Sequence, residues 1–244
     1  METEDKRPAS RNLFEHPDVE SLLETVMVSL VDESDRGAVL LAAVHVDECL
    51  KDLLSSVAPS GYAKKRQQLF GSLATRADAA FVGRLIGEPV YRSIQALRAL
   101  RNSVAHEAQK FKLEHHENKV RRIFELGPDV QPSIYRMAFD VMMSCKIPAM
   151  MEAVRDLRDP SDETQPYFNS PHELLEYISD RPKTLGLLEQ QFPRYKLAVG
   201  IWFIVAMLVW NRDAACALYD ESGTAASVEA KLRRLQEAQV GAEA

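Results

Sequence analysis

The longest apolar run in the chain, residues 197–210, limits the possible folds more than any other feature. The run covers 14 consecutive positions between Lys196 and Asn211 and includes no charged side chain. A helix needs roughly 20 apolar residues to cross a bilayer, so the run predicts a buried central helix of a soluble protein rather than a membrane span. Gly200 within the run permits close packing of a neighbouring element. Amphipathic helices at residues 19–30 and 138–154 are expected to enclose it.

The rest of the chain is patterned as helices, with apolar residues at the helical period and no alternating strand pattern. Prolines, glycines and capping residues separate these helices, as in the capping box of Ser170 and Glu173 around Pro171. We therefore predict an all-α fold, a bundle of about eight helices without a β-sheet. The expected organisation is a flexible N-terminus at residues 1–16, a single helical domain at residues 17–222 and a C-terminal helical tail at residues 223–244. The predicted helices cover residues 17–30, 36–57, 72–86, 89–106, 115–126, 132–158, a segment from 171, and 193–219.

Charge is distributed unevenly along the sequence. The formal net charge is -6, yet residues 61–122 contain 13 Lys or Arg residues against five Asp or Glu residues. Such a basic segment is typical of a surface for RNA or another polyanion, and it is equally typical of basic and acidic helices that pair within one domain. Both interpretations stay open. Direct binding to duplex DNA is not expected, because the whole chain is acidic and contains no helix-turn-helix pattern.

Motifs for cofactors, metals and export are missing from the sequence. It contains no glycine-rich phosphate loop and no paired-cysteine zinc spacing, and its first 12 residues are charged rather than apolar. The cysteines, Cys49, Cys145 and Cys216, lie far apart in apolar helical contexts, which predicts reduced core residues of a cytoplasmic protein. His115 and His116 diverge on a helix and are expected to be solvated. We predict no cofactor, no metal and no membrane association.

Residues 101–106 combine an arginine, an amide and an imidazole at the end of a predicted helix. Arg101 falls inside the apolar stripe of this helix, which consists of Val90, Ile94, Leu97 and Val104. A buried guanidinium requires a counterion, so Arg101 is predicted to be mostly buried beside a carboxylate, with Glu48 as the first choice and Arg76 in the same polar cluster. Asn102 and His106, four residues apart, would tie down the helix end. An exposed Arg101 without an acidic neighbour would remove the basis for both a scaffold role and a site role.

The order and spacing of short motifs across residues 36–126 resemble the mannitol operon repressor family of bacterial all-helical proteins. The motifs are Gly71-Ser72-Leu73-Ala74-Thr75-Arg76, Leu85-Ile86, Tyr91, Leu97 and the run from Leu100 to His106, preceded by a helix that carries Asp47-Glu48. The resemblance implies a non-enzymatic regulatory protein that acts through partner binding in transcriptional regulation. The partner is expected to be another protein or a second copy of the chain.

The end of the same helix also resembles a second family. Arg101, Asn102 and His106 match, position by position, the motif of HEPN helical-bundle domains, many of which are metal-independent endoribonucleases that act as dimers. The resemblance implies that these residues are catalytic, with the imidazole moving a proton and the guanidinium binding the phosphate. A homodimer would be required, because one copy has too few groups. A dimeric ribonuclease of toxin or defence type is therefore the alternative, and a structural interaction module is the third hypothesis.

Overall fold

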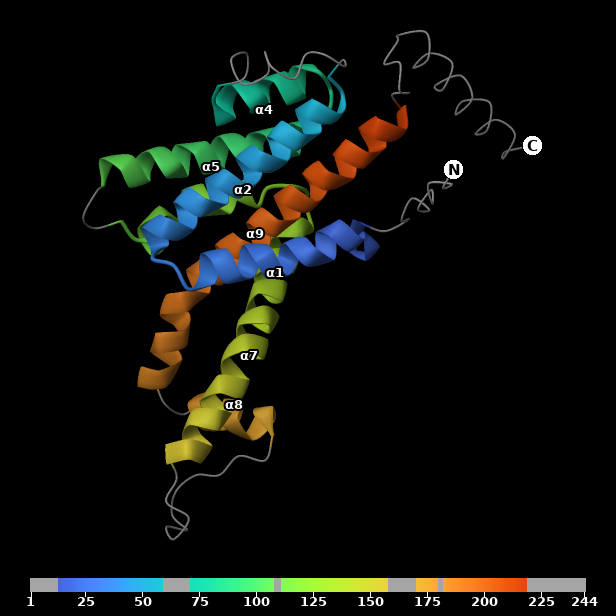
Figure 1. Cartoon of the computed structure of the whole chain (residues 1–244). Coiled ribbons are helices and arrows are strands. Elements are labelled where there is room, and N and C mark those ends of the chain that lie inside the picture. The colour runs from blue at the N-terminus through green and yellow to red at the C-terminus, as the bar shows by residue number, and fades with distance from the viewer. Residues whose placement is uncertain (1–12, 59–70, 108–110, 158–169, 180–181, 219–244) are drawn as a thin grey trace, which may run out of the picture.

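The structure, a computed structural model, describes residues 13–58, 71–107, 111–157, 170–179 and 182–218 (Figure 1). Within these ranges the protein is all-α, as predicted, with eight α-helices, two short 3-10 helices and no strand. The elements are η1 (Leu13–Glu15), α1 (Pro17–Val31), α2 (Asp35–Ser56), α4 (Leu73–Val82), α5 (Glu88–His106), η2 (Leu113–His116), α6 (Glu117–Ile123), α7 (Val130–Leu157), α8 (Pro171–Ser179) and α9 (Pro182–Leu218).

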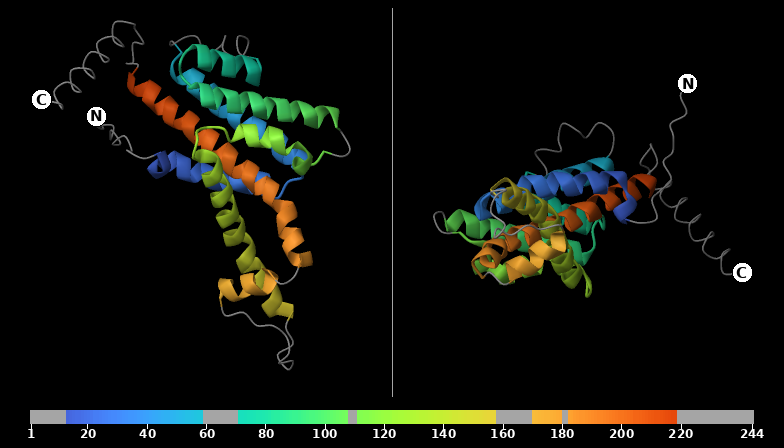
Figure 2. Two further views of the ribbon diagram at one scale, coloured as in Figure 1. Left: turned by 180° about the vertical axis from the view of Figure 1, so that it is seen from behind. Right: turned by 90° about the horizontal axis from the view of Figure 1, so that it is seen from below.

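Helix α9 forms the centre of the bundle. It packs against α1, α2 and α7, which are distant from it in the sequence. Figure 1 shows α1 crossing in front of α9 and α2 running alongside α9, and the view from behind in Figure 2 shows α6 and α7 on its other side. Helices α4 and α5 pack against α2 and complete the upper part of the bundle. The second half of α7, α8 and the first part of α9 extend away from it.

The predicted central helix is confirmed. All of residues 197–209 are buried except Phe203 and Met207, and α1 encloses them as expected, together with α2. The expected contribution of residues 138–154 is wrong, because Tyr135 already lies beside Lys196 and Phe139 beside Phe192, so this part of α7 passes the residues before the run. The start of the helix was predicted wrongly, since α9 begins at Pro182 and Pro193 lies inside it. An interior proline removes one backbone hydrogen bond and bends a helix, and α9 is bent in its first third (Figure 1).

Length alone does not separate α9 from a membrane helix. The segment Gln190–Cys216 spans 27 residues and is apolar enough to cross a bilayer by length and composition. It is the one helix of this kind in the part of the chain that the structure describes. However, 67% of its most apolar window is buried inside the protein. Burial, rather than the length of the apolar run, is therefore the observation that favours a core helix.

Gly200 allows α9 to approach the segment after α6. A Cβ atom at this position would overlap the ring of Phe124, which is itself fully buried. Any larger residue would force that ring to move within a packed core. The close packing predicted for Gly200 is thus confirmed.

The start of α8 and the end of α4 show how local sequence signals determine where a helix begins and where it stops. Ser170 Oγ accepts a hydrogen bond from the backbone N–H of Glu173 at 3.3 Å, so the predicted cap of α8 is present. Helix α4 ends at Val82, before the predicted position 86. Arg84 follows with a φ of 56°, a left-handed conformation that a continuing helix does not allow.

The segment before α1 belongs to the fold. Phe14, expected within a flexible N-terminus, packs its ring 5.4 Å from that of Trp202. The indole N–H of Trp202 in turn donates to the carbonyl oxygen of Val19 at 2.8 Å. These contacts hold the start of α1 on the central helix. The C-terminal helical tail predicted at residues 223–244 lies outside the described residues.

The cysteines are free, but the prediction that all three lie in the core is wrong. Cys145 and Cys216 are exposed, and Cys49 is half-buried. Cys145 lies on α7 and Cys216 lies near the end of α9, where apolar neighbours in the sequence do not imply enclosure in space. Burial, with a smaller contribution from the charge of Asp52, raises the pKa of the Cys49 thiol to about 11.

Candidate functional site

Helix α5 carries the candidate site at its C-terminal end. The helix starts after Gly87 with a proline in its first turn, a position where the missing N–H costs no hydrogen bond. Its apolar stripe packs against α2 and α6 and includes the buried residues Val90, Ile94, Leu97, Leu100 and Val104. His106 is the last helical residue. The motif of residues 101–106 therefore occupies the final turns of a well-anchored helix.

Arg101 is exposed, and this contradicts the prediction that it is mostly buried beside Glu48. No described residue forms a hydrogen bond or ion pair with its guanidinium. Helical periodicity puts Arg101 on the side of the apolar stripe, but the side-chain contacts of α4 with α5 involve Tyr91 and Gln95, in the first half of α5. The condition set out above is met, so the predicted scaffold role and the predicted site role of a buried Arg101 both lose their basis.

Asn102 and His106 are also exposed, and neither forms a hydrogen bond with a described residue. The prediction that they tie down the helix end is wrong for this part of the chain. Successive residues turn by about 100° around a helix, so Asn102 and His106 share one side, whereas Arg101 points about 140° away from His106. The three side chains of one copy do not face a common point. Together with Arg98 we call Arg101, Asn102 and His106 the α5 end surface.

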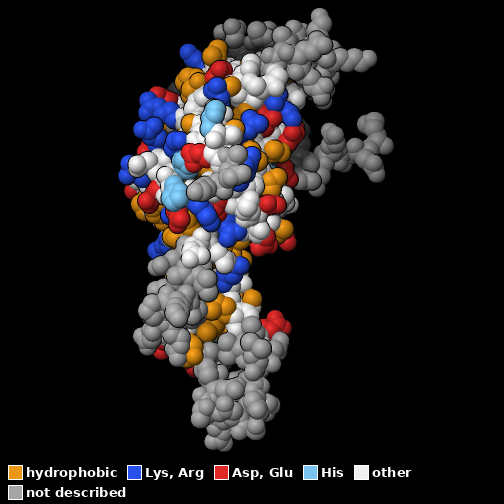
Figure 3. Space-filling view, turned by 90° about the vertical axis from the view of Figure 1, so that its left-hand side faces the viewer, with side chains coloured by type: hydrophobic (Ala, Val, Ile, Leu, Met, Phe, Trp, Pro, Cys, Tyr) orange, Lys and Arg blue, Asp and Glu red, His pale blue; other side chains and the backbone are white. Residues whose placement is uncertain are grey.

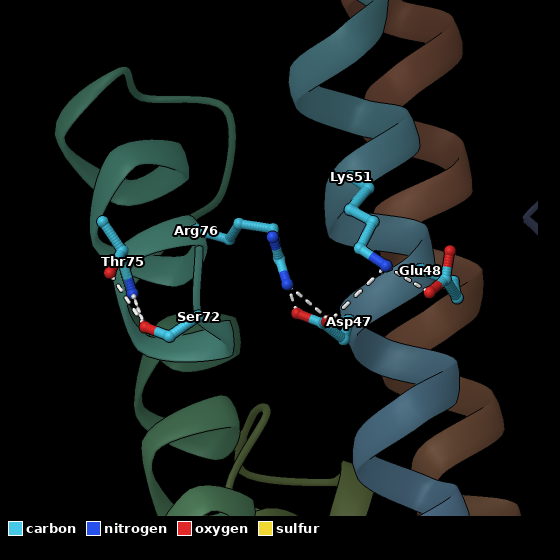
Figure 4. A network of polar contacts seen from close by, with 6 residues as sticks. All are labelled: Asp47, Glu48, Lys51, Ser72, Thr75 and Arg76. Carbon is cyan, nitrogen blue, oxygen red and sulfur yellow. Dashed lines mark hydrogen bonds and ion pairs between the residues drawn. The ribbon is translucent and has the colours of Figure 1, made fainter. Parts of the chain in front are cut away.

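Arg76 is the arginine that the fold buries with a carboxylate, and its partner is Asp47 (Figure 4). Its Nε and Nη2 atoms donate to the two carboxylate oxygens of Asp47 at 2.7 Å and 2.6 Å. The side chains are 10% and 20% exposed, so this bidentate pair is largely shielded from water. Ser72 caps the same helix by accepting from the N–H of Thr75. The pair fastens α4 onto α2, and the cap stabilises the start of α4.

Glu48, predicted for this polar cluster, lies on the surface instead. It forms an ion pair with Lys51 one turn along α2, and its side chain is 58% exposed. Glu48 follows Asp47 directly, so it is rotated by about 100° around the helix and points away from α4. The predicted cluster therefore contains Arg76 but not Glu48. A pattern of adjacent carboxylates does not by itself determine which of the two faces the neighbouring helix.

The chain folds back along α5 after its last turn. His116 Nε2 lies 2.9 Å from Glu107 Oε2, and the His116 ring stacks on Phe111 at 4.9 Å. Lys119 Nζ donates to Ser103 Oγ at 2.5 Å. His116 is therefore mostly covered, contrary to prediction, while His115 is exposed as expected. No group of His, Cys, Asp or Glu residues that could hold a metal ion occurs among the described residues.

The basic segment does not form one continuous patch in the described structure. Ser103, which Lys119 of α6 contacts, comes two residues after Arg101 and is turned about 200° from it around α5, so Lys119 and Arg101 lie on different sides of this helix. Arg92, near the start of α5, pairs with Glu88, as expected if basic and acidic groups of one domain neutralise each other. In Figure 3, Lys, Arg and His side chains gather on the upper half of the face where α5 ends, among scattered Asp and Glu. Positions 64–66 and 110 of the segment lie outside the described residues.

A further polar cluster, which no sequence pattern indicated, joins the two ends of the described chain. His16 Nε2 lies 2.8 Å from Asp213 Oδ2, and Arg212 donates to both Asp213 and Asp18. Burial by itself would raise the pKa of the Asp213 carboxyl, but the hydrogen bonds from Arg212 and His16 outweigh burial and lower this pKa below its ordinary 3.8. These residues are almost 200 positions apart, and no local pattern signals their contact.

Comparison of the chain with protein-family models, curated proteins and solved structures gave no match. The class established here is an all-α helical bundle.

Proposed function

We propose that this chain is a cytoplasmic, non-enzymatic regulatory protein that acts by binding a protein partner in transcriptional regulation, as its resemblance to the mannitol operon repressor family implies. The prediction that Arg101 is buried in a site was wrong, so a binding role rests on a different observation, the exposed position of Arg101 on the apolar side of α5. Its position on the helix is one at which the apolar stripe would continue, yet the side chain has no partner among the described residues. Because the Arg101 guanidinium forms no ion pair or hydrogen bond with a described residue, it is available to bind a group of another molecule.

The chemistry of the α5 end surface indicates the kind of partner. Arg98 and Arg101 are three residues apart and point to the same side of the helix. Arg98 is hydrogen-bonded to the neutral side chain of Gln95 at 2.8 Å, so its charge is not neutralised by that contact. Guanidinium groups bind planar carboxylates through two parallel hydrogen bonds. We therefore expect the partner to present Asp or Glu side chains to this surface.

The experiment replaces Arg101 in the native host and follows transcription. Strains that lack the gene are complemented with the wild-type chain, with Arg101→Glu, or with Arg92→Glu as a matched control on the same helix. RNA sequencing should show the transcript changes of the deletion restored by the wild type and by Arg92→Glu, but not by Arg101→Glu. A deletion without reproducible transcript changes would contradict a role in transcription, and full complementation by Arg101→Glu would contradict the surface.

Binding is then measured directly. A protein that co-purifies with the wild-type chain is identified by mass spectrometry and purified, and its affinity is determined by calorimetry. Arg101→Glu should weaken the complex by at least about tenfold, which corresponds to about 1.4 kcal/mol. Arg92→Glu should change the affinity less than about twofold. Equal effects of both variants would indicate general electrostatics rather than a contact at Arg101.

A second candidate function is the dimeric, metal-independent endoribonuclease that the HEPN resemblance implies. One observation favours it over a scaffold role: His106 is exposed and has no described hydrogen-bond partner, so its imidazole is accessible to a substrate. The divergence of Arg101 and His106 within one copy means that this chemistry would need groups from two chains.

Cleavage of single-stranded RNA in EDTA tests this candidate. If the protein is the proposed regulator, the purified wild type leaves the RNA intact. If it is the ribonuclease, the wild type cuts the RNA, His106→Ala abolishes the cut, and His115→Ala, a nearby exposed histidine, does not. The free energy of unfolding of His106→Ala should stay within about 0.5 kcal/mol of the wild type, because an exposed side chain contributes little packing.

A further inference from the structure

Helix α2 carries a ridge of exposed residues at every fourth position. Arg36, Leu40, Val44 and Glu48 are all exposed, and we call them the α2 ridge. Leu40 and Val44 are 38% and 52% exposed, so the middle of the ridge is apolar. One end of the ridge is basic and the other end is acidic. Figures 1 and 2 place α2 on an outer face of the bundle, beside α1.

Helix α1 extends the apolar part of this face. Ser29 Oγ lies 2.7 Å from His45 Nε2, which joins the two helices at one point. The helices follow each other through a short loop and run in roughly opposite directions (Figure 1). When two antiparallel helices touch at Ser29 and His45, the residue before Ser29 and the residue before His45 turn to the same side of the helix pair. Val28, which is 67% exposed, therefore lies on the same side as Val44.

We propose that the α2 ridge is the contact surface for a second copy of this chain. A twofold axis that crosses the ridge between Leu40 and Val44 makes the two α2 helices antiparallel. Leu40 of each copy then faces Val44 of the other, and Arg36 of each copy faces Glu48 of the other. Two helices whose ridges of residues four apart fit into each other's grooves cross at about −50°, the commonest geometry between helices.

The order of charges along the ridge selects a second copy as its occupant. A basic end, an apolar middle and an acidic end are complementary to the same ridge only when that ridge runs in the opposite direction. Among the described residues Glu48 pairs only with Lys51, and Arg36 also has an interaction within its own chain. Both side chains are exposed, and exposed pairs are weak, so each can exchange partners at little cost. The α5 end surface lies on another helix, so this dimer does not depend on the proposed regulatory function.

The first experiment measures the molar mass of the full chain by light scattering after gel filtration. The wild type should have twice the 27.5 kDa mass of one chain. Val44→Glu puts a carboxylate at the middle of the ridge and should yield the single-chain mass. Val82→Glu is the matched control, since Val82 is 81% exposed on α4, and it should remain dimeric. A wild type of single-chain mass up to about 100 μM, or a dimer that survives Val44→Glu, would overturn the proposal.

A charge exchange provides the second experiment and does not depend on Val44. Arg36→Glu and Glu48→Arg should each weaken the dimer by at least about tenfold, whereas the double variant should return to within about threefold of the wild type, because it restores opposite charges across the axis. Sedimentation measures the dissociation constants, and circular dichroism checks that each variant is folded. If the losses of dimer affinity in Arg36→Glu and Glu48→Arg add up in the double variant instead of cancelling, the predicted pairing is refuted.

Discussion

Asp47 and Glu48 are adjacent carboxylates with different predicted contributions to stability. Asp47→Ala removes both acceptors of the Arg76 guanidinium. Breaking a buried ion pair costs about 3–5 kcal/mol, but Asp47 is 20% exposed and Arg76 has at least one further interaction, so part of the loss is offset. We expect the free energy of unfolding to fall by about 2–4 kcal/mol. Glu48→Ala breaks only a surface pair with Lys51 and should cost less than about 0.5 kcal/mol.

Urea denaturation followed by circular dichroism, at one fixed protein concentration, measures both values. Arg76→Met completes a double-mutant cycle with Asp47→Ala, and the coupling energy between the two positions should account for most of the loss. Equal destabilisation by Asp47→Ala and Glu48→Ala would show that the bidentate pair does not hold α4 on α2. A coupling energy near zero would refute the same reasoning even if Asp47→Ala were destabilising.

Three further predictions concern other parts of the bundle. Gly200→Ala should lower the free energy of unfolding by about 1–3 kcal/mol, because the added methyl group overlaps the buried ring of Phe124. The control Gly87→Ala has room for a methyl group and should cost less than about 1 kcal/mol. Equal shifts of the two variants in thermal unfolding would contradict this prediction. The pKa of Asp213 is lowered in the fold, so its stabilising contribution is complete above its unfolded pKa and is lost as the pH falls through its folded pKa. Asp213→Asn should therefore reduce the loss of stability below about pH 4, and an unchanged pH dependence would argue against the cluster. Cys49, whose pKa is raised to about 11, should react with a thiol reagent far more slowly at about pH 8 than the exposed Cys216, and equal rates would contradict its burial.

The sequence predicted the helical class, most helix positions and the central helix because these depend on local chemistry. The capping box at Ser170 acts within four residues, and the apolar run at residues 197–210 requires enclosure wherever it lies. Close packing at Gly200 was also expected, although the requirement for glycine and its cause, the ring of Phe124, were not. The start of α9 was missed because Pro193 is a strong helix-start signal, and in this chain it is tolerated inside a helix.

The candidate site depended much more on tertiary structure. Helical periodicity places Arg101 on the side of the apolar stripe of α5, but whether that position is covered depends on the neighbouring helices, and α4 makes its side-chain contacts with α5 a few turns earlier, at Tyr91 and Gln95. The choice between Asp47 and Glu48 likewise depends on the side from which α4 approaches α2. The contact between His16 and Asp213 joins the two ends of the described chain. Periodicity determines the direction of a side chain around its own helix, and only the packing of the helices determines what that side chain meets.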